Sequence, residues 1–400
     1  HAPRTAPLIA SLVVAIAAVT LILSTVTFLR SYRSSIVESA RTSSAQAVSQ
    51  VVGTVGDYVN TIDEVMNLVM DSMDESPEER DAFLAALQTT RSEVVAVTTY
   101  DADGVLQEVV PYDIGFRRFE MINGVMCLNG ERVVFNGVNR HEWNDDRGRA
   151  IGADDMHAAM AVFKKNNINA VRTCHYPGQS LWYDLCDRNG IYMIDETNLE
   201  SHGSWQKLGA VEPSWNVPGS LPEWKDCVVD RARSMFERDK NHAAILIWSC
   251  GNESYAGEDI LAMSQFFHDH DPGRLVHYEG VFHCRAFDAI SDMESRMYAK
   301  PWEIREYLES HPKKPFILCE YMHDMGNSLG GMENYVRLAD EFDQYQGGFI
   351  WDYMDQALRH TDALGRSVLG YGGDFADRNT DYNFSGNGIV YADGAEKPAM

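Results

Sequence analysis

The sequence predicts an α/β protein whose larger part is a (β/α)8 TIM barrel, and three observations support this prediction. From residue 114 to the end, apolar runs with strand character recur eight times. Most of these runs are separated by segments in which apolar residues follow helical spacing. The alternation extends over about 270 residues, which is the length and the period of such a barrel.

Each expected strand is a short apolar run, and polar residues follow where the runs end. In a barrel these ends lie on one face, which is where catalytic groups cluster. The expected strands are 132–140, 169–176, 191–198, 243–250, 274–280, 288–295, 315–321 and 347–353. The expected helices between them are 154–167, 180–189, 223–239, 259–270, 301–311 and 332–345.

Residues 1–30 are expected to be a membrane anchor. The stretch 8–29 has 22 residues without a charge, enough at the helical rise to cross a bilayer core. We therefore predict a transmembrane helix and a membrane localisation, whereas relatives of the barrel are expected in the cytoplasm. A cleaved signal peptide is the alternative, and it would need a shorter apolar stretch with a small-residue cleavage site. The orientation stays open, because arginines flank both ends of the stretch.

Residues 31–99 are expected to form a helical segment. Apolar residues recur at steps of three and four between residues 48 and 73, which predicts a long amphipathic helix. Together with the anchor and a strand-like stretch, residues 8–104 resemble the opening of a bacterial membrane sensor protein. Residues 100–113 are expected to be the join to the barrel at 114–400 and to retain a strand of a preceding β-domain. This change of character predicts a chimaera.

The composition excludes one class of partner. The formal net charge is -25 with only 34 lysines and arginines, whereas binding to a phosphate backbone requires clustered basic residues. We therefore expect no nucleic acid partner. Seven cysteines are scattered without a C-x-x-C pair, which argues against a zinc or redox site. They are expected to be buried thiols in a reducing compartment.

Two glutamates follow directly on apolar runs. Glu253 comes after IWSCGN, and Glu320 comes after ILC. A carboxylate at a buried strand end is costly unless it has partners or a task. Two such groups over a barrel mouth meet the requirement of a retaining glycosidase, where one is acid and then base and the other is the nucleophile. From these residues alone, two salt-bridged glutamates stay an open alternative.

The motifs around these glutamates resemble those of a known family. IGFRRFE, LNGERVVFNGVNRHE, VRTCHYP, IDETNLESHG, IWSCGNES, ILCEYMHDMGNSLGG, GGFIWDYMDQAL and GGDFADRN follow one another in family order. The stretch 114–400 therefore resembles the catalytic domain of bacterial β-galactosidases of glycoside hydrolase family 2. The resemblance implies cleavage of terminal β-D-galactosyl residues by double displacement. It makes Glu320 the nucleophile, Glu253 the acid/base and Tyr298 the hydrogen-bond donor to the nucleophile.

The resemblance also implies residues that bind the β-galactoside substrate. His141 and His175 would bond sugar hydroxyls, and Asn252 would bond the 2-hydroxyl. Trp351 would stack on the sugar face, and Asn387 is expected near the substrate. Taken singly, these histidines and the asparagine at a strand end are more often structural, and a buried core residue is the alternative for the tryptophan, so their assignment depends on the motifs.

Two metal sites are implied in the same way. Glu200 and His202 lie two residues apart and match, together with Glu253, a magnesium site of the family. Phe384, through its carbonyl oxygen, and Asn387 match part of a sodium site. Family members carry β-domains before and after the barrel, and the sequence contains neither set complete. We therefore expect an incomplete sodium site and a homo-oligomer without its usual interfaces.

Two other functions stay open. The first is a membrane-anchored sensor or sugar-binding protein with an inactive, truncated barrel. The second is a β-glucuronidase or β-mannosidase of the same family, because these enzymes share the barrel and both carboxylates. The stretches around Glu253 and after Glu320 resemble galactosidases more than either of these. The resemblance therefore favours a β-galactosidase.

Overall fold

The computed structural model describes residues 96–100, 106–111, 115–202, 217–326, 329–377, 380, 382–398 and 400. The chain divides into two compact units, residues 1–114 and 115–400, and each is described by itself. In the first unit, β1 (Ala96–Tyr100) pairs antiparallel with β2 (Leu106–Pro111). The second unit holds all the residues predicted for catalysis and binding.

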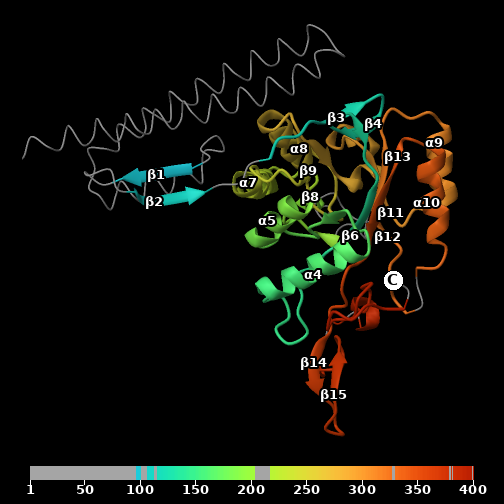
Figure 1. Ribbon diagram of the computed structural model, residues 1–400. Helices are drawn as coiled ribbons and strands as arrows, with labels where there is room; N and C mark the ends of the chain where they lie inside the picture. The colour runs from blue at the N-terminus through green and yellow to red at the C-terminus, as the bar shows by residue number, and fades with distance from the viewer. Residues whose placement is uncertain are drawn as a thin grey trace, which may run out of the picture. The chain divides into compact units, whose positions relative to one another are not determined.

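A parallel sheet of eight strands forms the centre of the second unit (Figure 1). The strand order is β10-β9-β8-β7-β6-β13-β12-β11, so the first strand of the chain's series pairs with the last. This order is that of a TIM barrel and confirms the predicted fold class of this part. The strands are β6 (Phe135–Asn139), β7 (Ala170–Arg172), β8 (Tyr192–Glu196), β9 (Ile245–Ser249), β10 (Leu275–His277), β11 (Glu294–Met297), β12 (Phe316–Tyr321) and β13 (Tyr345–Ile350).

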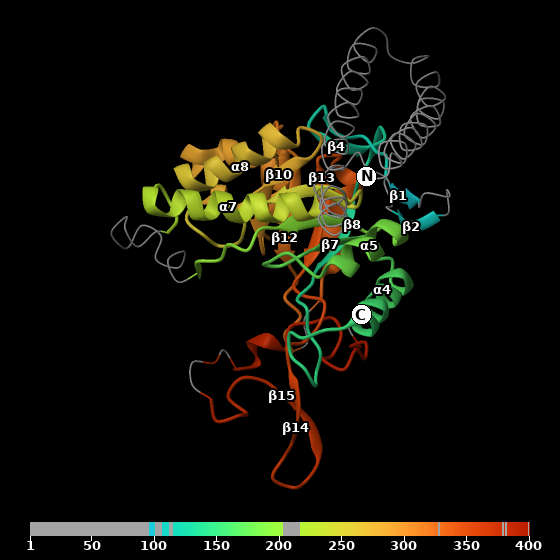
Figure 2. The ribbon, with the colours of Figure 1, turned by 90° about the vertical axis from the view of Figure 1, so that its left-hand side faces the viewer.

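Helices lie outside the sheet; α7 and α8 run side by side (Figure 2), and α9 packs against α10. Between β10 and β11 the chain forms two 3-10 helices, η2 (Glu279–Phe282) and η3 (Arg285–Ile290). The α-helices are α4 (Ala153–Lys165), α5 (Ser180–Asn189), α7 (Pro222–Asp239), α8 (Glu258–His270), α9 (Pro301–Glu309) and α10 (Met332–Glu341). All six agree with predicted helices to within a few residues at their ends.

Local sequence explains where several helices begin and end. In α4, the carboxylate of Asp155 accepts the N–H of Gly152 at 2.7 Å, which caps the first turn. Lys164 and Lys165 lie in its last turn, where positive charge complements the helix dipole. α5 ends at Gly190, whose φ of 68° suits the left-handed cap that glycine favours.

The amino end of the barrel is closed by a small antiparallel sheet. Its strands are β3 (Phe119–Ile122), β4 (Val125–Leu128) and β5 (Glu131–Arg132). Phe119 and Met126 of this sheet pack in one cluster with the barrel's inward side chains, including Ile247 and Phe349. The side-chain amide of Gln346 on β13 accepts the N–H of Met126 and donates to its carbonyl oxygen. Apolar residues therefore fill most of this end, and the buried Gln346 bonds the small sheet to the barrel.

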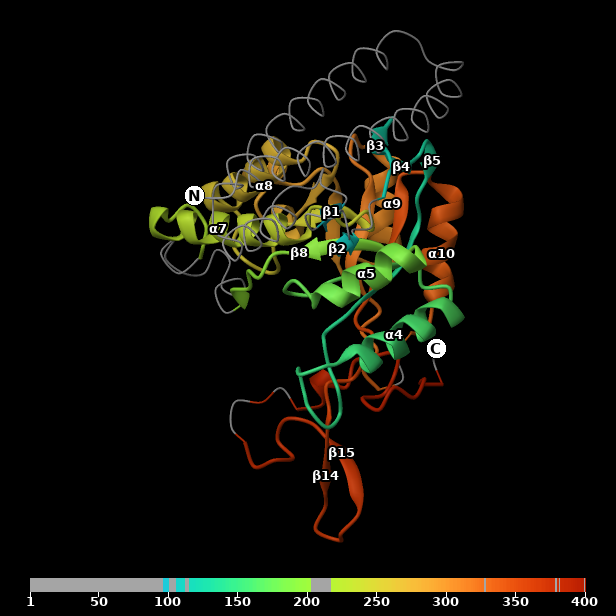
Figure 3. The ribbon, with the colours of Figure 1, turned by 60° about the vertical axis from the view of Figure 1, so that its left-hand side comes forward.

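After β13 the chain forms the hairpin β14 (Leu358–Thr361) and β15 (Ser367–Gly370), which projects from the barrel (Figure 3). A short helix η4 (Tyr382–Ser385) follows. Further on, Val390 forms isolated bridges to Met354 and Glu396, which ties the last described residues to the loop after β13.

The predictions for the amino-terminal part need correction. The predicted anchor at residues 8–29 and the predicted amphipathic helix at residues 48–73 lie outside the described residues. Among the helices that the structure does describe, none is long and apolar enough to cross a membrane. The longest of these, α7, has 18 residues; its buried side chains are mostly apolar (Val228, Ala232, Met235 and Phe236), and the rest of the helix carries many charged side chains. This finding contradicts the predicted membrane localisation, and we withdraw that prediction.

Candidate active site

The predicted catalytic residues meet at the carboxyl ends of the barrel strands. Glu320 lies within β12, and Tyr298 directly follows β11. Asn252 and Glu253 lie in the loop after β9. Because neighbouring barrel strands are parallel, these carboxyl ends lie together at one end of the barrel.

A fully buried arginine, Arg172 at the end of β7, links several of these residues. Its guanidinium donates to both carboxylate oxygens of Glu196, at 2.7 and 3.0 Å, and to Glu320 at 2.8 Å. It also donates to the amide oxygens of Asn139 at 2.9 Å and Asn252 at 2.8 Å. Burial opposes the charge of Arg172, but the carboxylates of Glu196 and Glu320 outweigh it and raise the pKa well above its usual range.

Glu320 is buried and held by two donors. Arg172 bonds one carboxylate oxygen, and the hydroxyl of Tyr298 donates to the other at 3.0 Å. Burial raises the pKa of Glu320, and the charge of Arg172 opposes this rise. Burial and the charge of Glu320 also raise the pKa of Tyr298, so the phenol keeps its proton and remains a donor. Two donors on an ionised carboxylate suit a nucleophile that must keep its charge and its orientation.

Glu253 lies in different surroundings. Its side chain is 19% exposed and contacts the imidazole of His202. Its backbone has a φ of 39°, a left-handed conformation that is uncommon for a residue other than glycine. Its N–H donates to the carboxylate of Glu279 at 2.8 Å. The neighbouring Asn252 donates from its amide to Glu200 at 2.7 Å.

Glu200, His202 and Glu253 form a candidate metal site. Each offers one ligand atom, and these atoms lie within 4.8 Å of one another. Burial raises the pKa of Glu200 to about 7, and the nearby charge of Glu253 adds to this effect. Two carboxylates brought together in this way are stabilised by a cation, and their oxygen atoms suit a divalent ion such as Mg²⁺. The residues present therefore fit the predicted ion.

Three aromatic rings form a wall beside Glu320. His175 stacks on Trp351 with ring centroids 5.0 Å apart and planes at 11°. His141 meets both rings edge-on, at 5.7 Å from His175 and 5.5 Å from Trp351. Burial lowers the pKa of each histidine to about 3, so both rings are neutral at neutral pH. The Nδ1 atom of His175 lies 2.7 Å from Glu196, which leaves Nε2 on the side of Glu320, at 3.9 Å.

The two residues predicted for sodium differ in their surroundings. Asn387 is buried, and its carbonyl oxygen accepts the N–H of Asp352 at 2.8 Å. Its side-chain oxygen has no hydrogen-bond partner within the described part of the chain, which fits an additional ligand. Phe384 is exposed, and its ring packs against His323 with centroids 4.6 Å apart.

Sequence reasoning missed Arg172, Glu196 and Glu279. Arg172 and Glu196 interrupt the apolar runs NAVRTCHY and IYMIDETN, and Glu279 follows the run RLVHY. The argument that a charged group in a buried strand needs partners was applied to Glu253 and Glu320 and holds equally for these three. A second chain of buried polar groups runs from Glu196 through the hydroxyl of Ser249 to His277.

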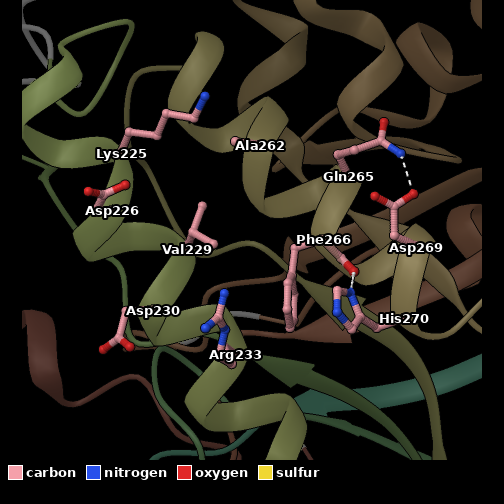
Figure 4. A pocket seen from close by; sticks show the side chains of 10 residues that line it. All are labelled: Lys225, Asp226, Val229, Asp230, Arg233, Ala262, Gln265, Phe266, Asp269 and His270. Atoms are coloured by element: carbon pink, nitrogen blue, oxygen red, sulfur yellow. Dashed lines mark hydrogen bonds between the residues drawn. The ribbon is translucent and has the colours of Figure 1, made fainter.

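Surface hollows lie elsewhere on the barrel. One of about 550 Å³ lies between α7 and α8, with Asp226 and Asp230 on the α7 side and Gln265 and Asp269 on the α8 side (Figure 4). Another of about 670 Å³ lies between α9 and α10, beside the exposed Trp302. Neither is lined by a residue predicted for catalysis or substrate binding.

Comparison with known proteins identifies the barrel. Residues 119–400 match the model of the glycosyl hydrolases family 2, TIM barrel domain. The chain is 64% identical over 301 residues to a protein of Halalkalibacterium halodurans named Beta-galactosidase, covering 75% of this chain and 30% of that protein. It is 59% identical over 307 residues to a Lactobacillus acidophilus protein named Beta-galactosidase large subunit, covering 76% of this chain and 49% of that protein.

A solved structure supports the fold. The chain resembles a β-glucuronidase from Ruminococcus gnavus in complex with D-glucuronic acid, with a TM-score of 0.56 and 20% identity. The similarity covers 76% of this chain and 54% of that structure, and at this identity it shows the fold alone. The chain thus spans between 30% and 49% of the length of the two relatives described above.

Proposed function

The chain belongs to the glycosyl hydrolases family 2, and from this premise we propose that it hydrolyses terminal β-D-galactosides with retention of configuration. Glu320 is the proposed nucleophile and Glu253 the proposed acid/base. The observation that carries the proposal is the setting of Glu320, a buried carboxylate between Arg172 and Tyr298 at the carboxyl end of a barrel strand. High identity to proteins named Beta-galactosidase supports the choice of galactosides.

The first step forms a covalent intermediate. A carboxylate oxygen of Glu320 attacks the anomeric carbon, and Glu253 gives its proton to the oxygen of the leaving alcohol as the glycosidic bond breaks. Arg172 and Tyr298 orient the carboxylate for the attack. As the Glu320 ester forms, negative charge leaves that group, and the bond from Tyr298 weakens.

The second step restores the enzyme. Glu253, now ionised, takes a proton from a water molecule as the water oxygen attacks the anomeric carbon. The bond to Glu320 breaks, and the electron pair returns to the carboxylate, where Arg172 and Tyr298 again stabilise it. Galactose with retained configuration is released.

The remaining predicted residues bind the sugar and ions. His141, His175 and Asn252 are proposed to bond hydroxyls, and Trp351 to form a wall against the sugar ring. Glu200, His202 and Glu253 would hold Mg²⁺, which supplies positive charge beside the acid/base when bound. Asn387, with Phe384, would contribute to a Na⁺ site and to the substrate side of the pocket.

A protein partner is also proposed. Relatives from Lactobacillus acidophilus and other species are named Beta-galactosidase large subunit. We therefore propose that the barrel assembles with further protein chains, either copies of itself or a different subunit. Size-exclusion chromatography with light scattering on the full chain distinguishes a monomer from an assembly.

The function is tested on the full chain with nitrophenyl β-galactoside, with and without magnesium. Glu320→Gln serves as the blank, and Glu294→Gln, a buried glutamate outside the site, serves as the matched control. We expect turnover in the wild type and in Glu294→Gln and none in Glu320→Gln. Folded wild-type protein without turnover on galactosides, glucuronides or mannosides would refute the proposed activity and favour a sugar-binding role.

A further inference from the structure

We propose that Glu279 is a positioning residue for Glu253, and that it acts by binding the backbone N–H of the acid/base. This inference rests on the proposed function, in which Glu253 gives and takes the proton. Glu279 lies directly after β10, at the start of η2. Among the described residues, the side chain of Glu279 forms no hydrogen bond with the carboxylate of Glu253 or of Glu320; it accepts the backbone N–H of Glu253.

Position matters for Glu253 because, among the described residues, few side-chain contacts fix its carboxylate. Its carboxylate contacts His202, which is itself 47% exposed. Glu320, by contrast, is held by Arg172 and Tyr298 inside the barrel. The location of the Glu253 carboxylate is therefore set mainly by its backbone.

That backbone adopts a conformation that needs support. The φ of Glu253 is 39°, and residues other than glycine adopt such values only where the surrounding structure holds them there. The preceding Gly251 has a φ of 139° and lies against the backbone of Leu199. The loop after β9 is thus turned sharply just where the acid/base must face the sugar.

Three successive backbone N–H groups of this turn, those of residues 252–254, have defined acceptors. Asn252 donates to the carbonyl oxygen of Leu199 at 2.9 Å, and Ser254 donates to the hydroxyl of Tyr278 at 3.0 Å. Between them, Glu253 donates to the carboxylate of Glu279 at 2.8 Å. The Tyr278 hydroxyl also donates to the carbonyl oxygen of Ser254. Tyr278 and Glu279 therefore clamp two successive residues of the turn.

The parallel pairing of β9 and β10 explains this geometry. His277 on β10 lies opposite Ser249 on β9, and its carbonyl oxygen accepts the N–H of Cys250 at 3.0 Å. Tyr278 and Glu279 are the next two residues after this last pair, at the level where β9 turns into the loop. The strand thus delivers the carboxylate of Glu279 to the N–H of Glu253.

A buried metal site is the competing interpretation of Glu279. His277, Glu279 and Cys319 each offer a ligand atom within 4.8 Å of the others. However, both ring nitrogens of His277 already lie at hydrogen-bond distance from serine hydroxyls, Ser249 at 2.9 Å and Ser295 at 2.8 Å. A histidine with both nitrogens engaged has no free lone pair to offer a cation, so the contact with Glu253 is the better account of Glu279.

The test compares two leaving groups in the full chain. The variants are Glu279→Leu, which removes the acceptor, Glu279→Gln, which keeps an acceptor oxygen, and Glu294→Leu, a matched loss of a buried glutamate on β11. For each, kcat/KM is measured on 2,4-dinitrophenyl and phenyl β-galactosides. A dinitrophenolate leaves without a proton, whereas phenolate needs the acid, so only phenyl galactoside reports the position of Glu253.

We expect Glu279→Leu to lower kcat/KM for the phenyl substrate at least about tenfold more than for the dinitrophenyl substrate. Glu279→Gln should restore the wild-type ratio to within about threefold, because an amide oxygen can accept the same N–H. Glu294→Leu should leave the ratio unchanged. An equal loss on both substrates, or no loss, in Glu279→Leu would overturn the proposal.

Amide hydrogen exchange tests the same contact without turnover. In the folded chain, the amide of Glu253 should exchange at least about tenfold faster in Glu279→Leu than in Glu294→Leu. Equal exchange in the two variants would overturn the positioning role. If the wild type turned over neither galactoside, the proposed function would fail, while the exchange comparison would still decide the role of Glu279.

Discussion

The surroundings of Glu320 differ from those of Glu253 in what fixes each carboxylate. Glu320 is enclosed, and side chains from β7 and from the end of β11 hold both of its oxygens. Glu253 is partly exposed, its backbone is held by Glu279, and its carboxylate faces a candidate metal site. The proposed nucleophile is thus fixed by a buried side-chain network, whereas the proposed acid/base is fixed by the geometry of its loop and lies at a candidate cation site.

Substitution of Glu320 or Glu253 should give the largest loss of activity, and the dependence of that loss on the leaving group should differ between the two. Glu320→Gln removes the attacking group, so we expect kcat/KM to fall at least about 10⁴-fold on every galactoside, whatever the leaving group. Glu253→Gln should spare 2,4-dinitrophenyl galactoside in the first step, because that leaving group needs no proton. The measurement is steady-state kinetics on both substrates. Equal losses in the two variants on both substrates would remove the distinction between the two roles.

Breaking the buried network of Arg172, Glu196 and Glu320 should lower the free energy of unfolding more than breaking a surface ion pair. Arg172→Met leaves Glu196 and Glu320 buried without their cation, and we expect a loss of about 3–5 kcal/mol in the free energy of unfolding. The matched control is Arg118→Met, because Arg118 pairs with Glu120 on the surface and its loss should cost at most about 1 kcal/mol. Urea denaturation measures both. Similar losses for the two arginines would contradict a central role of Arg172.

At the candidate metal site beside Glu253, substitution should instead change the affinity for Mg²⁺. His202→Ala is expected to weaken Mg²⁺ binding at least about tenfold, because it removes one of three convergent groups. Its stability should stay close to that of the wild type, because the ring of His202 is largely exposed. Titration calorimetry on the folded chain gives the affinity, and His360→Ala on β14 is the control. Unchanged affinity in His202→Ala would exclude this residue as a ligand.

A smaller effect is expected from His277, which Ser249 links to Glu196: the free energy of unfolding should depend on pH. Burial lowers the pKa of His277 to about 3, whereas an unfolded histidine titrates near 6.5. The unfolded state therefore binds more protons between these values, and stability falls as the pH falls through this window. Relative to His277→Gln, the wild type should lose up to about 1.4 kcal/mol per pH unit below pH 6. A difference that stays constant from pH 6.5 to pH 4.5 would show that His277 is not held neutral.

Much of the barrel could be predicted because its elements are encoded locally. The predicted helices at 180–189 and 223–239 match α5 and α7, whose apolar spacing and end signals are strong. The clearest shift is at β11, predicted at 288–295 and found at Glu294–Met297. There, residues 285–290 form the 3-10 helix η3, which an apolar run alone does not distinguish from a strand.

The candidate site was predicted in its reacting groups but not in its support. Motifs single out Glu253 and Glu320, and the contact of Tyr298 with Glu320 follows the predicted pairing. Sequence reasoning missed the role of Arg172 because its partners lie up to 148 residues away along the chain, on strands that only the closed barrel brings together. The role of Glu279 depends on a backbone N–H in an unusual conformation, which no side-chain pattern reports.

The hydrogen bonds of the Arg172 guanidinium to distant residues have a consequence for the order of folding. Its partners Asn139, Glu196, Asn252 and Glu320 come from β6, from β8, from the loop after β9 and from β12. Glu320 arrives with the next-to-last strand of the barrel to be synthesised. In a nascent chain without β12, the Arg172 guanidinium would lack the negative charge that Glu320 supplies, and its site would still be open to water. The barrel closes when β13, which follows β12, pairs with β6, so Arg172 gains its last carboxylate partner just before the strand that completes the barrel is made.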